Sequence, residues 1–301
     1  MRLDATGGAR TMSLAEGLLR TARPRQWLKN GLVFAAPAAG GLLGHGAVVR
    51  PAIVTFVAFC LGASGLYFIN DARDVEEDRR HPRKSQRPIA AGAVPVGLAA
   101  VIGMVAVALA LALALLALNA KTCIVLAIYL VESILYTLWL KHEFVLDIAL
   151  VATGFLLRAV AGGVATGADP SKWFLLAVSF GSLFVIAGKR LSEFVVLGED
   201  REQHRRALRG YSEQSLRSIV TLAATALLLT YCLWAFEQSE LAVHPILHQV
   251  TIAPFLVAVL RYLVDVCAGN AGAPEEALLR DPVVLLSGLT WGGLYLAAVY
   301  A

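Results

Sequence analysis

Residues 51–78, PAIVTFVAFCLGASGLYFINDARDVEED, place a long apolar stretch directly before a cluster of acidic residues. A helix needs roughly 20 apolar residues to cross the hydrocarbon core of a membrane, and residues 51–70 are enough. Because the bilayer interior offers no water to the backbone, a segment there satisfies its own hydrogen bonds as a helix. The stretch therefore predicts a membrane-spanning helix that ends on an acidic surface.

The rest of the 301-residue chain has the same character, with 58% hydrophobic residues, 16% charged residues and a mean hydropathy of +0.68. Soluble domains carry about 25% charged residues. The four cysteines form no Cys-x-x-Cys pair, which argues against a zinc or disulfide framework. We expect an all-α, polytopic membrane bundle of nine transmembrane helices, at about 27–44, 51–70, 94–118, 122–140, 144–166, 172–188, 216–236, 246–264 and 283–300.

The basic residues give this bundle an orientation. All but four of the 26 lysines and arginines lie in the N-terminal arm or in the loops after every second run; Arg50, Lys121 and Lys172 lie opposite, and Arg158 lies inside a run. Basic loops remain cytoplasmic. We expect a plasma-membrane protein with a cytoplasmic N-terminus, an extracytoplasmic C-terminus, a cytoplasmic arm (1–22) and one transmembrane domain (23–301).

The one-sided positive charge has two interpretations. It suits anionic lipid headgroups or a polyanionic substrate, and it is also explained by membrane topology alone. We expect the membrane as a partner and no nucleic acid. The sequence sets no oligomeric state, and a homo-oligomer is among the states it allows.

The acidic helix end predicts a metal site. At 100° per residue, Asn70, Asp71, Asp74 and Asp78 fall within about one third of the helix circumference. Mg²⁺ binds carboxylate and amide oxygens and shares its other positions with phosphate. The alternative is a solvated acidic helix end, but carboxylates at a helix C-terminus oppose the helix dipole. The pattern therefore favours Asn70, Asp74 and Asp78 as Mg²⁺ ligands beside a diphosphate.

Residues 81–92, HPRKSQRPIAAG, end this helix with proline and return Lys84 and Arg87 toward the same surface. Lysine offers a phosphate a point charge, and arginine offers it two parallel donors. Together with the carboxylates they form a plausible diphosphate clamp.

These motifs, Asn-Asp-x-x-Asp-x-x-x-Asp followed by His-Pro-x-Lys-x-x-Arg-Pro-Ile-Ala-x-Gly, resemble the UbiA superfamily of intramembrane prenyltransferases. Other segments resemble one branch of it, the actinobacterial decaprenyl-phosphate phosphoribosyltransferases. These segments are RPRQWLKN (23–30), LRAVAGGVA (157–165), SKWFLL (171–176), GKR (188–190), LRY (260–262) and VDV (264–266).

The resemblance implies Mg²⁺-dependent transfer of 5-phosphoribose from phosphoribosyl pyrophosphate (PRPP) to decaprenyl phosphate. The products are decaprenylphosphoryl-5-phosphoribose, which serves cell-wall arabinan synthesis, and pyrophosphate. It implies a cytoplasmic active site that the polyprenyl phosphate lipid enters from the bilayer. By this resemblance the catalytic residues are Asp74, Asp78, Lys84 and Glu193, and the substrate is bound by Gln26, Lys29, Asn70, Asp71, Lys84, Arg87, Tyr136, Lys141, Asp147, Lys189 and Arg190.

The chain departs from the superfamily at its second acidic motif. Residues 188–194, GKRLSEF, carry one carboxylate, Glu193, and two cations, Lys189 and Arg190. These cations suit a phosphate that carries no metal, such as the 5-phosphate of PRPP. The alternative is a Lys189–Glu193 pair on one helix face.

The branch also resembles this chain at Tyr136, Lys141 and Asp147, where ribose, phosphate and a metal or ribose hydroxyl are the implied ligands. Each residue has an ordinary alternative as an interface anchor or a snorkelling charge. Arg158 and Glu132 lie inside predicted spans and are expected to face the bundle interior. They can pair with each other, or Arg158 can contact the lipid; a structural role for Arg158 is favoured.

The implied reaction needs no general base, because a phosphate monoester, with a second pKa of about 6, is already ionised at neutral pH.

Two alternative functions remain. An aromatic prenyltransferase using a prenyl diphosphate predicts a second acidic cluster, which residues 188–194 lack. A transporter predicts paired interrupted helices, which the sequence does not contain.

Overall fold

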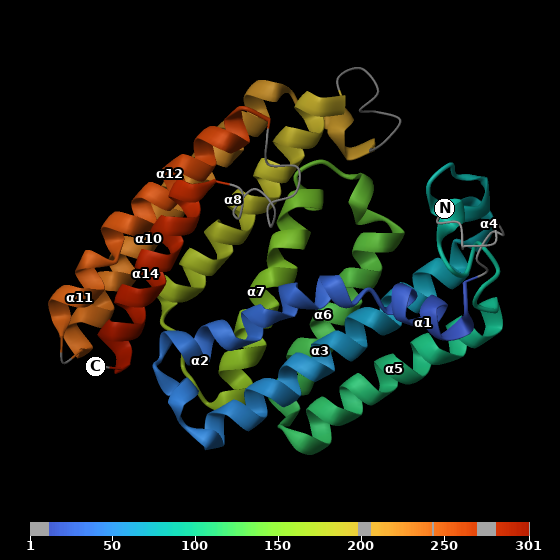
Figure 1. Ribbon diagram of the computed structural model, residues 1–301, viewed down its shortest axis with the longest axis horizontal. Helices are drawn as coiled ribbons and strands as arrows, with labels where there is room; N and C mark the ends of the chain where they lie inside the picture. Colours follow the sequence, from blue (N-terminus) through green and yellow to red (C-terminus); the bar gives the residue numbers. More distant parts are fainter. Residues whose placement is uncertain (1–11, 198–205, 243, 270–280, 301) are drawn as a thin grey trace, which may run out of the picture.

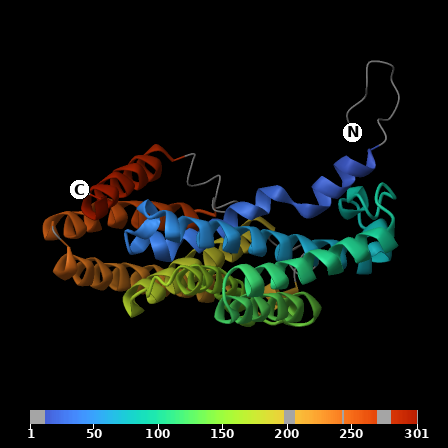
Figure 2. The same ribbon diagram turned by 90° about the horizontal axis from the view of Figure 1, so that it is seen from below.

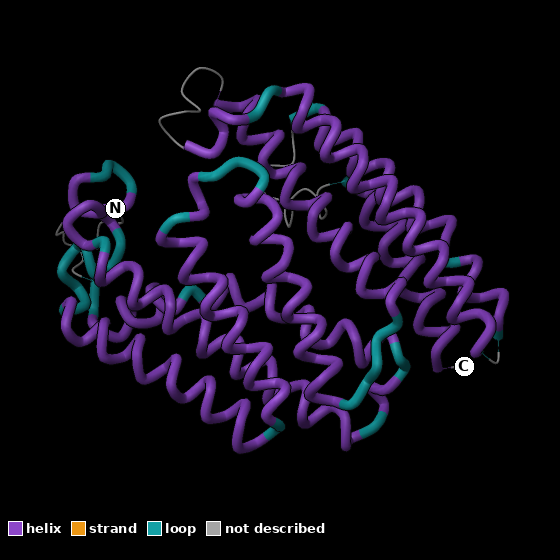
Figure 3. Tube along the Cα trace, turned by 180° about the vertical axis from the view of Figure 1, so that it is seen from behind, coloured by secondary structure: helices purple, strands orange, loops and turns teal. Residues whose placement is uncertain are grey.

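A computed structural model describes residues 12–197, 206–242, 244–269 and 281–300. Within these residues the structure is helical and contains no strand (Figure 3). The helices are α1 (Leu14–Ala22), η1 (Pro24–Phe34), α2 (Ala35–Ala39), η2 (Leu42–Gly44), α3 (Gly46–Arg73), α4 (Val75–Arg80), η3 (Lys84–Gln86), α5 (Val96–Ala117), α6 (Ala120–Leu138), η4 (Leu140–His142), α7 (Leu146–Thr166), α8 (Lys172–Leu197), η6 (Arg206–Gly210), α10 (Glu213–Leu241), α11 (Pro245–Val250), α12 (Ile252–Cys267) and α14 (Pro282–Tyr300), where η marks a 3-10 helix.

Eight helical segments in the described chain are long and apolar enough to cross a membrane: α3, α5, α6, α7, α8, α10, α11 with α12, and α14. The expected count of nine is not confirmed, because the run at 27–44 forms η1, α2 and η2 instead of one continuous helix. Gly41, with φ of 67°, has the left-handed backbone that ends α2 and turns the chain toward α3.

The long helices form two groups (Figures 1 and 2). One core, which includes Phe59, Leu126 and Leu130, lies among α3, α5, α6 and α7. A second core, which includes Phe184, Leu216 and Val266, lies among α8, α10 and α12. Helix α14 packs beside α12, and α7 contacts α8 to join the two groups. The C-terminal ends of α3, α6 and α8 lie on one side of the bundle (Figure 1).

The N-terminal segment packs against α7 through a glycine. A Cβ atom added to Gly162 would lie 1.8 Å from the carbonyl oxygen of Val33 in η1, which no real side chain tolerates. This close approach carries Lys29 and Asn30, also in η1, toward the middle of the bundle. Small residues allow such backbone contacts between membrane helices.

We expect Gly162→Ala to destabilise the protein by about 1–3 kcal/mol, because the added methyl group forces η1 away from α7. Thermal unfolding of the purified protein in detergent measures the effect. Gly293→Ala is the matched control, since nothing lies within 4 Å of the added Cβ atom in α14. Equal melting temperatures for the two variants would contradict this account of the packing.

Candidate active site

A polar cavity of about 330 Å³ opens where several helix ends converge. Its lining includes Lys29 from η1, Asn70 from α3, Tyr136 from α6, and Lys189 and Arg190 from α8. All five belong to the set of substrate-binding residues expected from the sequence. Residues distant in the sequence thus meet around one space that is rich in positive charge.

The acidic helix end lies beside this cavity and is held by an ion-pair network. The carboxylate of Asp71 accepts hydrogen bonds from Arg23 at 2.8 and 3.0 Å and from Arg87 at 3.0 Å. Arg87 also donates to Asp78 at 2.7 Å, and the Lys84 ammonium lies 4.0 Å from the other oxygen of Asp78. The sequence-predicted cations therefore do return to the acidic surface.

Asn70, Asp74 and Asp78 remain on one helical face, as expected, although the helix is interrupted between them. Helix α3 ends at Arg73 and α4 begins at Val75, yet the backbone N–H of Asp74 donates to Asn70, and that of Asp78 donates to Asp74, each at 2.9 Å. The i to i+4 spacing of these three residues is thus retained. Asp74 also lies 3.4 Å from Arg73, and its side chain is 29% exposed.

Arg23 is a member of this network that residue type alone did not single out. It joins α1 to η1 with φ of 54° and ψ of 60°, a left-handed conformation that costs a non-glycine residue of order 1–3 kcal/mol. Its guanidinium also stacks over Tyr67, at 4.4 Å from the ring centroid. These contacts fix the start of the N-terminal segment to α3.

Asp147 lies in the wall of the site and organises its neighbours. It is fully buried, and its carboxylate accepts hydrogen bonds from Arg190 Nε at 2.6 Å and from the Tyr136 hydroxyl at 2.8 Å. Arg190 also pairs with Glu193 at 3.0 Å. These hydrogen bonds allow Asp147 to orient the side chains of Tyr136 and Arg190.

The remaining predicted residues lie near the site. Gln26 in η1 and Lys141 in η4 are half-buried and do not belong to the cavity lining. Arg158 and Glu132 line the deeper part of the cavity. Of the two alternatives for Arg158, a direct ion pair with Glu132 is not formed, because the charged groups are not within 4.0 Å of each other, although the two interact electrostatically across the cavity lining.

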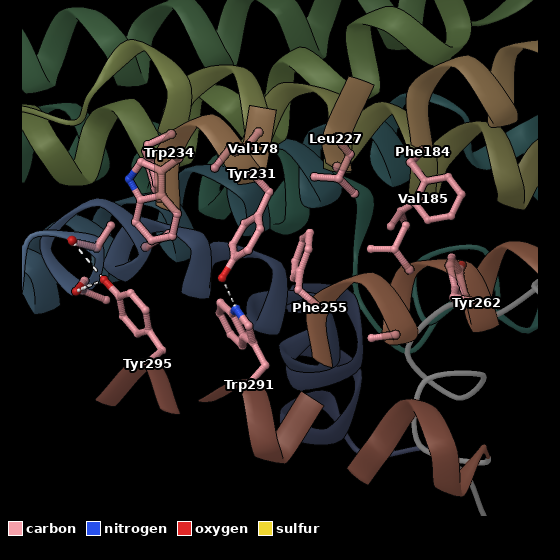
Figure 4. Close-up of a pocket in the computed structure, with 18 of the residues that line it drawn as sticks. Val178, Phe184, Val185, Leu227, Tyr231, Trp234, Phe255, Tyr262, Trp291 and Tyr295 are labelled. Atoms are coloured by element: carbon pink, nitrogen blue, oxygen red, sulfur yellow. Dashed lines mark hydrogen bonds between the residues drawn. The ribbon is translucent and has the colours of Figure 1, made fainter. Parts of the chain in front are cut away.

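An apolar cavity adjoins the polar cavity. Phe155 lines both the polar cavity and an apolar cavity of about 290 Å³, which in turn shares Val178, Gly181 and Val185 with a larger cavity of about 480 Å³. The larger cavity is lined by aromatic side chains from four helices (Figure 4), among them Tyr231, Trp234, Phe255, Trp291 and Tyr295. The sequence did not predict this larger cavity, because single aromatic residues on separate helices form no local pattern.

The acidic helix end offers only a small set of oxygen ligands to the expected Mg²⁺. Within the described residues, no group of three or more His, Cys, Asp or Glu side chains is arranged to hold a metal. Mg²⁺ usually keeps several waters and binds one or two carboxylates together with substrate phosphates. The Asn70 amide and the Asp74 carboxylate, one helical turn apart, can supply the few protein ligands that such a Mg²⁺ ion needs.

The chain belongs to the UbiA prenyltransferase family, whose model matches residues 32–267. It is therefore a multi-pass membrane protein, as the sequence predicted. It is 45% identical over 300 residues to the decaprenyl-phosphate phosphoribosyltransferase of Mycolicibacterium smegmatis, a match that covers 96% of this chain and 94% of the relative. It is 43% identical to the protein of that name from Corynebacterium glutamicum, over 96% of this chain and 88% of the relative.

Solved structures share the fold. A UbiA homolog from Archaeoglobus fulgidus bound to DMAPP and Mg²⁺ superposes with a TM-score of 0.68 at 19% identity, covering 94% of this chain and 99% of that one. The same homolog bound to GPP and Mg²⁺ gives a TM-score of 0.67 at 18% identity, over 95% and 100%.

We expect Asp147→Ala to destabilise the protein by about 3–5 kcal/mol, because it leaves Arg190 as a buried cation without its closest carboxylate. The double variant Asp147→Leu with Arg190→Leu is expected to recover much of that loss, since it removes both charges. Thermal unfolding of the single and double variants tests this. A double variant that is less stable than Asp147→Ala would contradict it.

Proposed function

We propose that this chain transfers 5-phosphoribose from PRPP to decaprenyl phosphate and releases pyrophosphate. The observation that carries the proposal is a cation-lined polar cavity that adjoins an apolar cavity at Phe155, a residue in the lining of both. One ligand is then a soluble polyanion and the other an amphipathic lipid. The relatives that share 43–45% identity with nearly the whole chain support this pair of substrates.

In this proposal the donor occupies the end of the cavity near the acidic helix. Asn70 and Asp74 would hold Mg²⁺, with Asp78, buried and paired with Arg87, as a further carboxylate at the same surface, and the bound metal would neutralise charge on the diphosphate. Lys84 and Arg87 provide cationic groups for the leaving pyrophosphate. Their present carboxylate contacts keep them oriented toward that surface.

Other side chains position the sugar. Lys189 and Arg190 bind the 5-phosphate, and Lys29 of η1 lines the same cavity. Tyr136, fixed by its hydrogen bond to Asp147, faces the ribose. Gln26 and Lys141, outside the cavity lining, are further polar contacts for the donor, and Glu193 restrains Arg190.

The reaction is a displacement at the anomeric carbon. An oxygen of the lipid phosphate forms a bond to that carbon, and the bond from carbon to the pyrophosphate oxygen breaks, with its electron pair leaving on pyrophosphate. The nucleophile is ionised at neutral pH, so no protein base is required. The protein contributes positioning and electrostatic stabilisation.

The proposed site faces the cytoplasm of a plasma-membrane protein with its N-terminus inside. Charge asymmetry supports this orientation, because Lys189 and Arg190 line the same cavity as Asn70, and Arg23 and Arg87 pair with the adjacent Asp71. The C-terminus is then outside if η1 and α2 cross beside α3. At roughly 2.0 Å per residue in a 3-10 helix and 1.5 Å in an α-helix, these two elements extend close to 30 Å.

This topology predicts which single cysteines are accessible. In a background without the four native cysteines, His45→Cys, in the exposed loop before α3, is expected to react with a membrane-impermeant maleimide added to intact cells. Ser13→Cys and Arg80→Cys are expected to react only after the membrane is opened. Labelling of Ser13→Cys and His45→Cys from the same side would contradict the crossing of η1 and α2.

The activity is tested with purified protein, Mg²⁺, ribose-labelled PRPP and decaprenyl phosphate, by following label into the lipid fraction. We expect transfer that EDTA abolishes and excess Mg²⁺ restores. Asp74→Ala is expected to lower the rate about 100-fold or more, because it removes a carboxylate that serves the metal. Arg217→Gln, an exposed cation of α10 outside the site, is the control and should retain the rate of the unmodified protein.

Two results would overturn the proposal. One is the absence of labelled lipid although the protein is folded. The other is transfer of a prenyl group from a prenyl diphosphate to an aromatic acceptor under the same conditions, which would establish the rival activity.

A further inference from the structure

Arg158 carries a positive charge into the interior of the bundle. It lies in α7 at roughly 16 Å beyond Asp147, given a rise of 1.5 Å per residue. The residue is only 8% exposed. Charged residues at such depth are costly and usually serve a ligand or a partner charge.

The direct hydrogen-bond partners of Arg158 are neutral, and the Glu132 carboxylate, which lines the same cavity, interacts with its charge without a direct ion pair. Its Nε donates to the side-chain oxygen of Asn30 at 2.8 Å, one terminal nitrogen donates to the Gly154 carbonyl at 2.6 Å, and the other donates to the Tyr129 hydroxyl at 2.9 Å. Within the described part of the chain, no carboxylate lies within 4.0 Å of the guanidinium. The hydrogen bonds orient the side chain, but they do not neutralise its charge.

The guanidinium has capacity for an anion. It carries five N–H donors, and the three hydrogen bonds use one on each nitrogen. Each terminal nitrogen therefore keeps one N–H that can donate to a phosphate oxygen. Arg158 also lines the polar cavity, so an anion can reach it.

The position of Arg158 between the polar and apolar cavities indicates the kind of anion that it can bind. Phe155, one helical turn earlier, lines both the polar cavity and the apolar space, and its ring centroid lies 5.4 Å from the Arg158 guanidinium carbon. The cation therefore stands at the boundary between the polar and apolar compartments. A ligand there has a phosphate on one side and a hydrocarbon chain on the other.

We propose that Arg158 binds the phosphate of the polyprenyl phosphate acceptor, a role that rests on the proposed function. The prenyl chain then lies across Phe155 in the apolar space. The phosphate faces the cytoplasmic end of the cavity, where Asn70 and Lys189 receive the soluble donor. Asn30 and Tyr129 act as positioning residues, because they set the orientation of the guanidinium.

The same chemistry, a phosphate monoester, also occurs as the 5-phosphate of PRPP. Kinetics with both substrates varied separate the two sources. We expect Arg158→Lys, which keeps the charge but loses the paired donors, to raise the apparent KM for decaprenyl phosphate about tenfold or more. The KM for PRPP is expected to stay within about twofold. An increase confined to PRPP, or a fall in kcat with both KM values unchanged, would overturn the assignment.

A binding measurement tests the assignment without turnover. Native mass spectrometry of the full-length protein, without PRPP, compares decaprenyl phosphate with decaprenol, which lacks the phosphate. We expect the unmodified protein and the control Arg217→Gln to prefer the phosphate, and Arg158→Gln to lose at least about tenfold of that preference. Where Arg158→Gln does not fold, by its melting temperature, Arg158→Lys decides the question through the same comparison.

The two proposals fail in different ways. Phosphate-selective lipid binding that depends on Arg158, in a protein without ribosyl transfer, would refute the proposed function and leave the assignment of Arg158 standing. Ribosyl transfer together with an unchanged phosphate preference in the folded Arg158 variants would refute only the assignment.

Discussion

The buried ion pair between Asp147 and Arg190 is the interaction on which the rest of the site depends. Its 2.6 Å contact joins α7 to α8, and so joins the N-terminal helix group to the C-terminal one. In surroundings that lack water, such a pair persists only when its remaining donors and acceptors are also satisfied. Tyr136 and Glu193 meet that need, and the same contacts form one wall of the polar cavity.

The two helix groups supply different chemistry to adjacent cavities. The first group and η1 provide most of the polar lining, with α8 adding Lys189 and Arg190. The second group provides an aromatic cavity without charged residues in its lining (Figure 4). Phe155 belongs to both compartments. This gradient from charge to hydrocarbon suits a reaction in which a soluble polyanion meets a lipid phosphate.

Much of this arrangement follows from local sequence patterns. The apolar run at 51–70 became α3, and the i to i+4 spacing of Asn70, Asp74 and Asp78 survived the break between α3 and α4. The run at 27–44 forms η1, α2 and η2, because Gly40 and Gly41 end α2 after Ala39, and hydrophobicity measures preference for lipid and does not report such breaks in the backbone. The sequence also left open whether Arg158 and Glu132 form a direct ion pair, since helix rotation decides which atoms meet, and in the structure they do not.

Local sequence patterns were sufficient to predict the membrane helices, the acidic helix end, the returning cations and the family, because each depends on residues close together in the chain. The contact of Arg23 with Asp71, the contact of Asp147 with Arg190, and the adjacency of a polar and an apolar cavity arise from the tertiary structure. Packing between helices explains this difference. Contacts across helices depend on rotation and close approach, as at Gly162 and Val33, and neither is encoded in the spacing of residues along one helix.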